Sequence, residues 1–263
     1  MTNEVSAPTP TKTDEKALAD AMKSMVELMS RMYRNQVLLE LNKGTIEKFS
    51  DAQTGNYASI LVKLSNQIQK KLIKRFSNKR IEKLARKVLL RSDARSKKIF
   101  YERMGKSMGL DPSKLMKKDG MTYDINALVL ETTQWAKKLR DETLEMYTAN
   151  SLRMMTLGES MESILSEFDE MEEKRKNHAV FTARNQIQNF NSITNKTRAQ
   201  KLGIKKAVWI SSRDERTRPS HAWRDGREFD ISKGLYSSMD GETLLPATIY
   251  RCRCSYKFLI DED

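Results

Sequence analysis

The sequence predicts a mostly α-helical protein in which long N-terminal helices are followed by a small α+β C-terminal domain. Apolar residues recur three and four positions apart over much of the chain before Gly203, which is typical of amphipathic helices. Short runs rich in aromatic and β-branched residues, which are typical of strands, follow that glycine. A charged fraction of 32% against a hydrophobic fraction of 38% over 263 residues fits a helix-rich protein with much exposed surface.

We expect three segments along the chain. Residues 1–14 contain Ala, Pro, Thr, Asn and Lys with no apolar periodicity, and we interpret them as a flexible tail. Residues 15–156 form the predicted helical N-terminal region, and residues 157–263 form the predicted C-terminal α+β domain. No run of residues is apolar over the length of a bilayer, and the N-terminus lacks the apolar core of a signal peptide. We therefore expect assembly in the cytoplasm and no membrane partner.

A stripe of apolar side chains marks one face of the first predicted helix, which starts near Glu15. Side chains at this spacing form either part of a core or a coiled-coil seam. Methionine adapts to irregular surfaces, so the stripe also suits docking to another protein. The stripe consists of Leu18, Met22, Met25, Met29 and Met32.

A strongly basic segment follows, and we predict basic amphipathic helices within residues 57–106. Between Lys63 and Lys106 the chain carries 16 Lys and Arg against 3 Asp and Glu, a net charge of +13 that equals the net charge of the whole chain. Nucleic acid is the commonest polyanion for such a segment. The alternatives are a solvated helix face and, less favoured because aromatic anchors are few, a membrane surface. The predicted DNA-binding residues are Lys70, Lys71, Lys74, Arg75, Lys79, Arg80, Lys83, Arg86, Lys87 and Arg91.

Capping residues predict where several later helices begin and end. Asp111 precedes Pro112 and is placed to cap a short helix that starts at this proline. Thr122 or Asp124 is placed to cap the next long helix. A last helix, from about His178 to Lys201, leads to Gly203 as the residue just beyond its end.

A compact polar motif organises the C-terminal region, and it follows a short apolar strand that contains Trp209. Arg216 and Arg218 can form forked hydrogen bonds with carboxylates such as Asp214 and Asp225, and an Asp-Gly pair indicates a turn. A second strand is predicted from Tyr250 to Ile260, with Cys252 and Cys254 on it. The residues of this structural motif are Trp209, Asp214, Arg216, Arg218, His221, Asp225 and Gly226.

The same region contains candidate zinc ligands. His221, Cys252 and Cys254 can supply an imidazole nitrogen and two thiolates, with Asp214 or His178 as a fourth ligand. A disulfide across one intervening residue would be strained, so reduced or metal-bound thiols are expected. The alternative is a buried cluster of hydrogen-bonded side chains without a metal. A nuclease built on Asp214, His221 and Asp225 is a weaker hypothesis, because no second carboxylate–histidine pair and no phosphate-binding loop accompanies them.

The C-terminal motif also resembles a known family. The order Asp-Glu-Arg-Thr-Arg-Pro-Ser-His, then Asp-Gly, then Pro246 and Cys-Arg-Cys is similar to the C-terminal domain of phage Mu F-type minor head proteins. The stretch from Phe181 to Asn191 and the turn at Gly203 resemble the helix and turn that precede this domain. The resemblance implies a non-enzymatic minor virion protein of a tailed phage that acts in head assembly inside the head, at or near the portal vertex. It implies the portal protein or the major capsid protein and double-stranded DNA as partners, with several copies per particle.

Two other functions remain open from the sequence. The first is a nucleoid-like, non-specific DNA-binding protein whose C-terminal domain is only a scaffold. The second is a metal-dependent nucleic-acid enzyme that uses the C-terminal motif.

Overall fold

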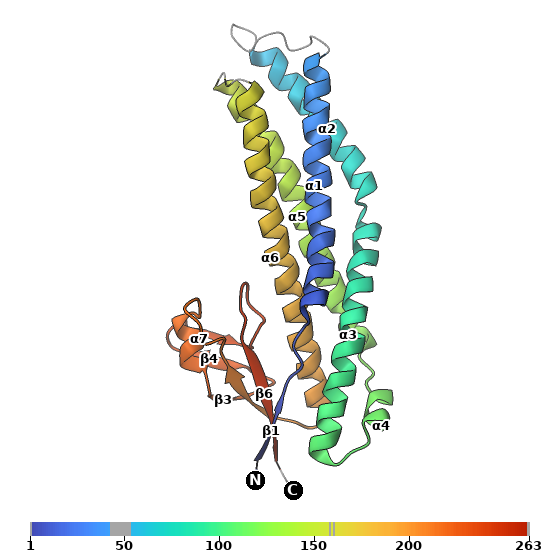
Figure 1. The fold of residues 1–263 in the computed structure, drawn as a ribbon, viewed down its shortest axis with the longest axis vertical. Helices are drawn as coiled ribbons and strands as arrows, with labels where there is room; N and C mark the ends of the chain where they lie inside the picture. The colour runs from blue at the N-terminus through green and yellow to red at the C-terminus, as the bar shows by residue number, and fades with distance from the viewer. Residues whose placement is uncertain (1, 43–53, 158, 160, 262–263) are drawn as a thin grey trace. The chain divides into compact units, whose positions relative to one another are not determined.

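The computed structural model describes residues 2–42, 54–157, 159 and 161–261 (Figure 1). This part of the chain is mostly helical, with small β-sheets near the C-terminus, and it confirms the predicted fold class. Within these residues no helix is both long and apolar enough to cross a membrane. The helices are α1 (Lys12–Asn42), α2 (Thr54–Arg75), α3 (Asn78–Met108), α4 (Pro112–Lys117), α5 (Thr122–Thr156), α6 (Met161–Lys201) and α7 (Pro219–Arg224). The strands are β1 (Thr2–Ser6), β2 (Lys206–Ile210), β3 (Glu228–Asp230), β4 (Leu235–Ser237), β5 (Glu242–Leu244) and β6 (Ser255–Asp261).

The chain forms two compact units that are interleaved along the sequence. One unit, which we call the sheet unit, contains residues 1–18, 86–130 and 182–263, and the other, the helical unit, contains residues 19–85 and 131–181. This division does not coincide with the predicted boundary near residue 157. Four long helices, α1, α3, α5 and α6, contribute residues to both units. Interleaving of this kind depends on contacts between distant segments, which helical periodicity does not report.

The helical unit packs segments of α1, α2, α3, α5 and α6 around a core that contains the methionines of the stripe. Met22, Met25 and Met29 are at most 4% exposed, so the prediction that the stripe is part of a core is confirmed and these side chains are not available for docking. Tyr33 of α1 lies 5.5 Å from both Tyr147 of α5 and Phe168 of α6, measured between ring centroids. The stripe methionines are therefore buried by the same chain.

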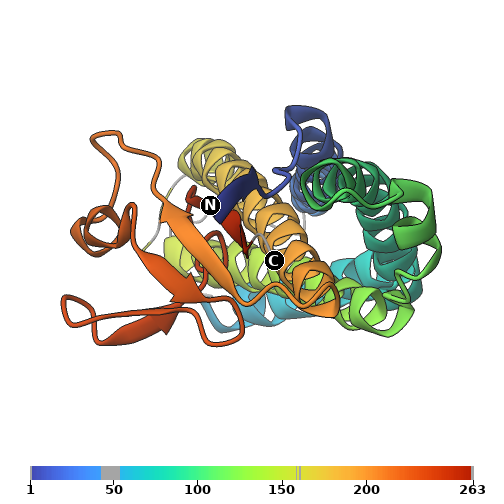
Figure 2. The ribbon, with the colours of Figure 1, turned by 90° about the horizontal axis from the view of Figure 1, so that it is seen from below.

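The sheet unit is built on a four-stranded antiparallel sheet with the order β1-β6-β2-β3. β1 pairs with β6 along its whole length, from Thr2 opposite Asp261 to Ser6 opposite Lys257, and Figure 2 shows the two strands side by side. The prediction of a flexible tail is therefore wrong for these residues. Val5 and Ala7 are buried in the core of this unit. The sequence gives no sign of this strand because its pairing partner lies about 250 residues away, at the other end of the chain.

Helix segments cover one face of this sheet. The ring of Phe100 on α3 packs edge-to-face on Phe258 of β6, with centroids 5.7 Å apart. The hydroxyl of Tyr256, also on β6, donates a 2.7 Å hydrogen bond to the carbonyl oxygen of Ser192 on α6. Helices α3 and α6 are thus fixed to the central strand by both apolar and polar contacts.

Two of the predicted helix ends are confirmed, the start of α4 and the end of α6. Asp111 accepts a 2.9 Å hydrogen bond from the backbone N–H of Ser113 at the start of α4. Gly203 has a φ of 79°, and Ile204 donates its backbone N–H to the carbonyl oxygen of Ala199 at 3.0 Å. Helix α6 therefore ends at a glycine in the left-handed conformation, as the sequence predicts, and the chain continues into β2.

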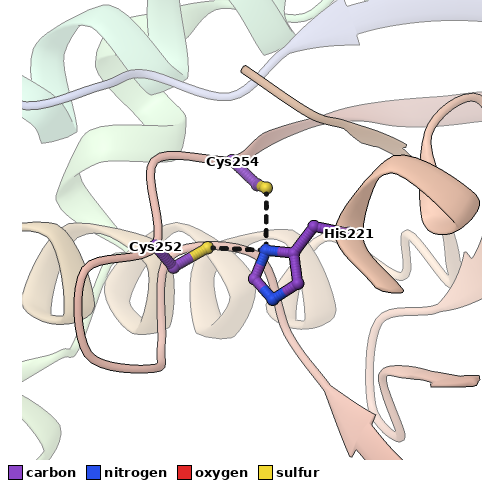
Figure 3. A group of neighbouring side chains, drawn as sticks. All are labelled: His221, Cys252 and Cys254. Atoms are coloured by element: carbon purple, nitrogen blue, oxygen red, sulfur yellow. Dashed lines mark hydrogen bonds between the residues drawn. The ribbon is translucent and has the colours of Figure 1, made fainter. Parts of the chain in front are cut away.

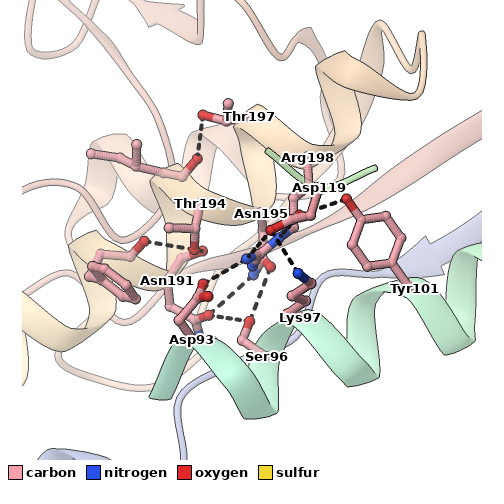
Figure 4. Close-up of polar contacts among 12 residues, drawn as sticks. Asp93, Ser96, Lys97, Tyr101, Asp119, Asn191, Thr194, Asn195, Thr197 and Arg198 are labelled. Carbon is pink, nitrogen blue, oxygen red and sulfur yellow. Dashed lines mark hydrogen bonds and ion pairs between the residues drawn. The ribbon is translucent and has the colours of Figure 1, made fainter. Parts of the chain in front are cut away.

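A buried ion network ties the helices of the sheet unit together (Figure 4). The Arg198 guanidinium on α6 is fully buried and donates to Asp93 on α3 at 2.7 Å and to Asp119, between α4 and α5, at 2.8 Å. Lys97 lies 3.3 Å from Asp119, so two cations and two carboxylates balance each other. Burial alone would raise the pKa of Asp119, but hydrogen bonds from Arg198 and from the Tyr101 hydroxyl outweigh it and lower that pKa. The sequence analysis did not identify this arginine.

Replacing Arg198 by methionine should destabilise the protein by about 3–5 kcal/mol, because two buried carboxylates would lose the cation that compensates them. Urea denaturation followed by circular dichroism measures this change. Lys98→Met is the matched control, since it breaks an exposed pair with Glu102 on α3 and should cost less than about 1 kcal/mol. Equal losses in the two variants would contradict a structural role for the network.

Candidate metal centre and the C-terminal motif

The motif after β2 is a loop and short helix that the carboxylate of Asp225 closes. This carboxylate accepts the backbone N–H of Ser211 at 2.7 Å and the Arg213 guanidinium at 2.8 Å. Gly226 has a φ of 72°, which favours glycine, and its N–H donates to the carbonyl oxygen of Trp209 at 2.8 Å. The predicted Asp-Gly turn is therefore present and returns the chain to β3.

Trp209 lies at the centre of the motif, where it is fully buried. The guanidinium of Arg224 lies 5.4 Å from its ring centroid, and the ring of His221 packs against it edge-on at 5.5 Å. Arg224 is also fully buried and holds both carboxylate oxygens of Asp240, at 2.7 and 2.9 Å. It donates further to the backbone carbonyl oxygens of Leu235 and Glu242. A buried arginine thus braces the β4–β5 hairpin, and the sequence analysis missed it because nothing in the local spacing marks its partners.

The predicted pairing of the motif arginines is wrong. Asp214 forms its ion pair with Arg253, which lies between the two cysteines. Arg216 offers Asp214 only its backbone N–H, at 3.2 Å. Arg218 donates to the backbone carbonyl oxygen of Tyr250 at 2.9 Å. Arginines therefore join the loop from Ser211 to Arg218 to the segment from Tyr250 to Cys254, one from each of the two segments. These contacts depend on tertiary structure.

The imidazole and the two thiols of the candidate metal site meet, as predicted. Nδ1 of His221 lies 3.3 Å from Sγ of Cys254 and 3.6 Å from Sγ of Cys252. Figure 3 shows both sulfur atoms facing this same ring nitrogen. All three residues are buried, and all three potential ligand atoms lie within 4.8 Å of one another. Among the described residues, this group includes neither Asp214 nor His178, so neither proposed fourth ligand joins it.

The two cysteines precede β6 and do not lie on it, which corrects the strand predicted from Tyr250. They are free thiols. The hydrogen bond from Cys254 lowers the pKa of Cys252 despite burial, and the hydrogen bond to Cys252, together with burial, raises the pKa of Cys254. The backbone N–H of Ala247 also donates to Cys252 Sγ, at 3.3 Å. The pair is therefore arranged so that one sulfur readily carries a negative charge.

Nine of the ten residues predicted to bind DNA are exposed, on α2 and on the first half of α3. The exception, Arg86, is partly buried and donates to the side-chain oxygen of Asn126 at 2.7 Å. Helix α2 contains no acidic residue. Among the residues that the structure describes, no ion pair engages Lys70, Lys71 or Lys74. Their charges are available to an outside partner.

The fold and the site define a helical protein that carries a small, arginine-braced sheet with a buried imidazole–thiol group. Residues 130–257, which include α6 and the whole C-terminal motif, match the family described as Phage Mu protein F like protein. The resemblance predicted from the motif is thereby confirmed over this segment of the chain. The match extends further toward the N-terminus than the domain predicted from residue 157.

A relative is found in Haemophilus influenzae. An uncharacterised protein of that organism is 26% identical over 225 residues, which cover 85% of this chain and 49% of the relative. The chain thus spans about half the length of the curated relative that it matches. No solved structure matches the chain.

The ion pair between Arg253 and Asp214 should be visible in the titration of the aspartate. The hydrogen bond from Arg253, with a smaller one from Thr217, lowers the pKa of Asp214 to about 2. Because the folded-state pKa is depressed, the ion pair should persist as the pH falls and be lost only near pH 2. Carbon-13 NMR of the side-chain carboxyl measures this pKa.

In Arg253→Gln the pKa of Asp214 should return toward its ordinary value of 3.8. Arg216→Gln is the matched control, because that side chain is the partner that the sequence suggested and the structure gives it no role. A larger shift in Arg216→Gln than in Arg253→Gln would contradict the observed pairing.

Proposed function

We propose that this protein is a structural, minor component of the head of a tailed bacteriophage and that it acts in head morphogenesis. The observation that carries the proposal is the match of residues 130–257 to the phage Mu protein F-like family, which supports a head morphogenesis protein. Trp209 and His221 of the C-terminal motif are buried, and both of its carboxylates, Asp214 and Asp225, accept hydrogen bonds, which is in keeping with a structural role. Asp214 and Asp225, the carboxylates that the nuclease hypothesis requires, are each paired with an arginine.

We further propose that the protein lies inside the head, at or near the portal vertex, in several copies. Its partners there are the portal protein or the major capsid protein. Assembly takes place in the host cytoplasm before the particle is complete. The resemblance implies these locations and partners, and the exposed basic residues of α2 and α3 fit a place where the packaged DNA is within reach.

Contact with packaged DNA is the part of the proposal that the side chains support most directly. Exposed lysines and arginines displace condensed counterions from phosphates, and this gives binding without sequence preference. A nucleoid-like DNA-binding protein would use the same side chains. That second function is favoured only if the protein associates with DNA and with neither portal nor capsid protein.

The location in the particle tests the proposed function. We expect mass spectrometry of purified virions and of their DNA-free precursors to detect this polypeptide at a fixed ratio to the portal protein. Cross-linking in the same particles should join it to the portal or to the major capsid protein. Absence from both kinds of particle would remove the proposal.

DNA binding should depend on the cations of α2. Replacing Lys70, Lys71, Lys74 and Arg75 with glutamine in the full chain should weaken binding to duplex DNA. Each lost phosphate contact lowers the magnitude of the slope of log K against log salt by about 0.9, so four lost contacts lower it by up to about 3.6. Fluorescence anisotropy with a labelled duplex at several salt concentrations measures the slope.

The matched control removes four charges from other exposed positions. Lys114, Lys117, Lys118 and Lys205 are exposed, and their replacement by glutamine gives the same net charge as the α2 variant. The salt slope should stay close to that of the unmodified protein. Equal effects of the two variants would show that net charge and not α2 determines binding.

A further inference from the structure

We propose that His221, Cys252 and Cys254 bind one zinc ion, through the imidazole Nδ1 and two thiolates, and that this ion is a structural element of the sheet unit. The proposal is independent of the role in the phage head. It assigns to the C-terminal motif a ligand that the function proposed above does not require.

The distances from the ring nitrogen to the two sulfur atoms fit a tetrahedral zinc ion. Zinc binds thiolate sulfur at about 2.3 Å and imidazole nitrogen at about 2.0–2.1 Å, so in a tetrahedral site the nitrogen and a sulfur lie about 3.5 Å apart. The corresponding distances from Nδ1 of His221 are 3.3 Å to Cys254 and 3.6 Å to Cys252. Both nitrogen–sulfur distances are therefore within a few tenths of an ångström of the tetrahedral value.

The second observation that supports a bound metal is that both sulfur atoms face the same ring nitrogen of His221. A single N–H can point at one sulfur, whereas both sulfur atoms here face Nδ1 (Figure 3). Nε2 of His221 is buried and has no hydrogen-bond partner within the part of the chain that the structure describes. The two sulfurs are thus the polar contacts that this buried ring makes, and a shared cation accounts for both of them.

A backbone contact favours the Cys252 sulfur in the charged form, which zinc requires. The backbone N–H of Ala247 donates to Cys252 Sγ at 3.3 Å, and hydrogen bonds of this kind support metal-bound thiolates. Ala247 has a φ of 64°, in the left-handed region that favours glycine, and this conformation directs its N–H inward. Two thiolates, a neutral imidazole and Zn²⁺ sum to zero charge, so the filled site can be buried without an uncompensated charge.

The ion would join two segments that β-sheet hydrogen bonds do not connect. His221 lies on α7, and the cysteines lie in the loop that precedes β6. Among the described residues no fourth His, Cys, Asp or Glu is part of the group, so we assign the fourth position to a water molecule. The ion pair of Asp214 with Arg253 joins the same two segments at the surface.

Metal content and cobalt substitution test the site in the untagged full-length chain. We expect protein purified without chelators to contain close to one zinc per chain by elemental mass spectrometry. After removal of zinc, titration with CoCl₂ should give the intense sulfur-to-cobalt absorption of tetrahedral thiolate ligation, and ZnCl₂ should abolish it. His221→Ala, Cys252→Ser and Cys254→Ser should each weaken cobalt binding by at least about tenfold.

Two matched controls separate this site from incidental binding. Asp214→Asn and His178→Gln alter the two residues that the sequence suggested as fourth ligands, and both should keep the zinc content and the cobalt spectrum. If the variants of the three ligands do not fold, the unmodified protein still decides the matter. Folded unmodified protein that holds no stoichiometric zinc and gives no thiolate–cobalt absorption would overturn the proposal.

Discussion

The buried guanidinium of Arg198 is the constraint on which the sheet unit depends. It joins α3, through Asp93, and the α4–α5 connection, through Asp119, to the end of α6. These residues come from two of the three chain segments that form the unit, and backbone hydrogen bonds of a helix cannot join one such segment to another. A buried arginine is tolerated because its charge is matched by carboxylates at hydrogen-bond distance. The sheet adds the third segment, since β1 is fixed to β6 by the ladder of an antiparallel pair.

A second buried arginine that is paired with a carboxylate lies beside the candidate metal centre. Arg224 is fully buried, is held by both oxygens of Asp240, and packs over the indole of Trp209. It thereby positions α7, the helix that carries His221, relative to the β4–β5 hairpin. The position of the imidazole thus depends on an arginine that touches neither cysteine. Two buried arginines, one in the helical part of the unit and one in the motif, fix the frame in which the ligands meet.

The sequence predicted those features that are encoded locally. Helical periodicity predicted the long helices, and the glycine at position 203 predicted the end of α6. The residue types of the C-terminal region predicted that His221 lies close to the two cysteines. It failed where a contact joins distant segments. β1 contains one large apolar residue, Val5, and becomes a strand only because β6 pairs with it. Asp214 pairs with Arg253, and Asp225 pairs with Arg213. The sequence suggested Arg216 and Arg218 as the partners, because these arginines also lie close to the carboxylates along the chain. The methionine stripe showed correctly that one face of α1 is apolar, but periodicity cannot say whether that face is covered by the same chain or by another.

The contrast between buried and exposed charge separates structural residues from those available to partners. In the sheet unit, the fully buried arginines Arg198 and Arg224 have carboxylates at hydrogen-bond distance. On α2, five basic residues share a helix with no acidic residue at all, and all five are exposed. Repulsion among the like charges slightly destabilises such a helix, so neutral residues at these positions would stabilise the protein at least as well. Because these charges give the helix no structural benefit, their concentration on α2 supports the proposed contact with a polyanion, and the packaged genome of a phage head is the polyanion that the proposed function supplies.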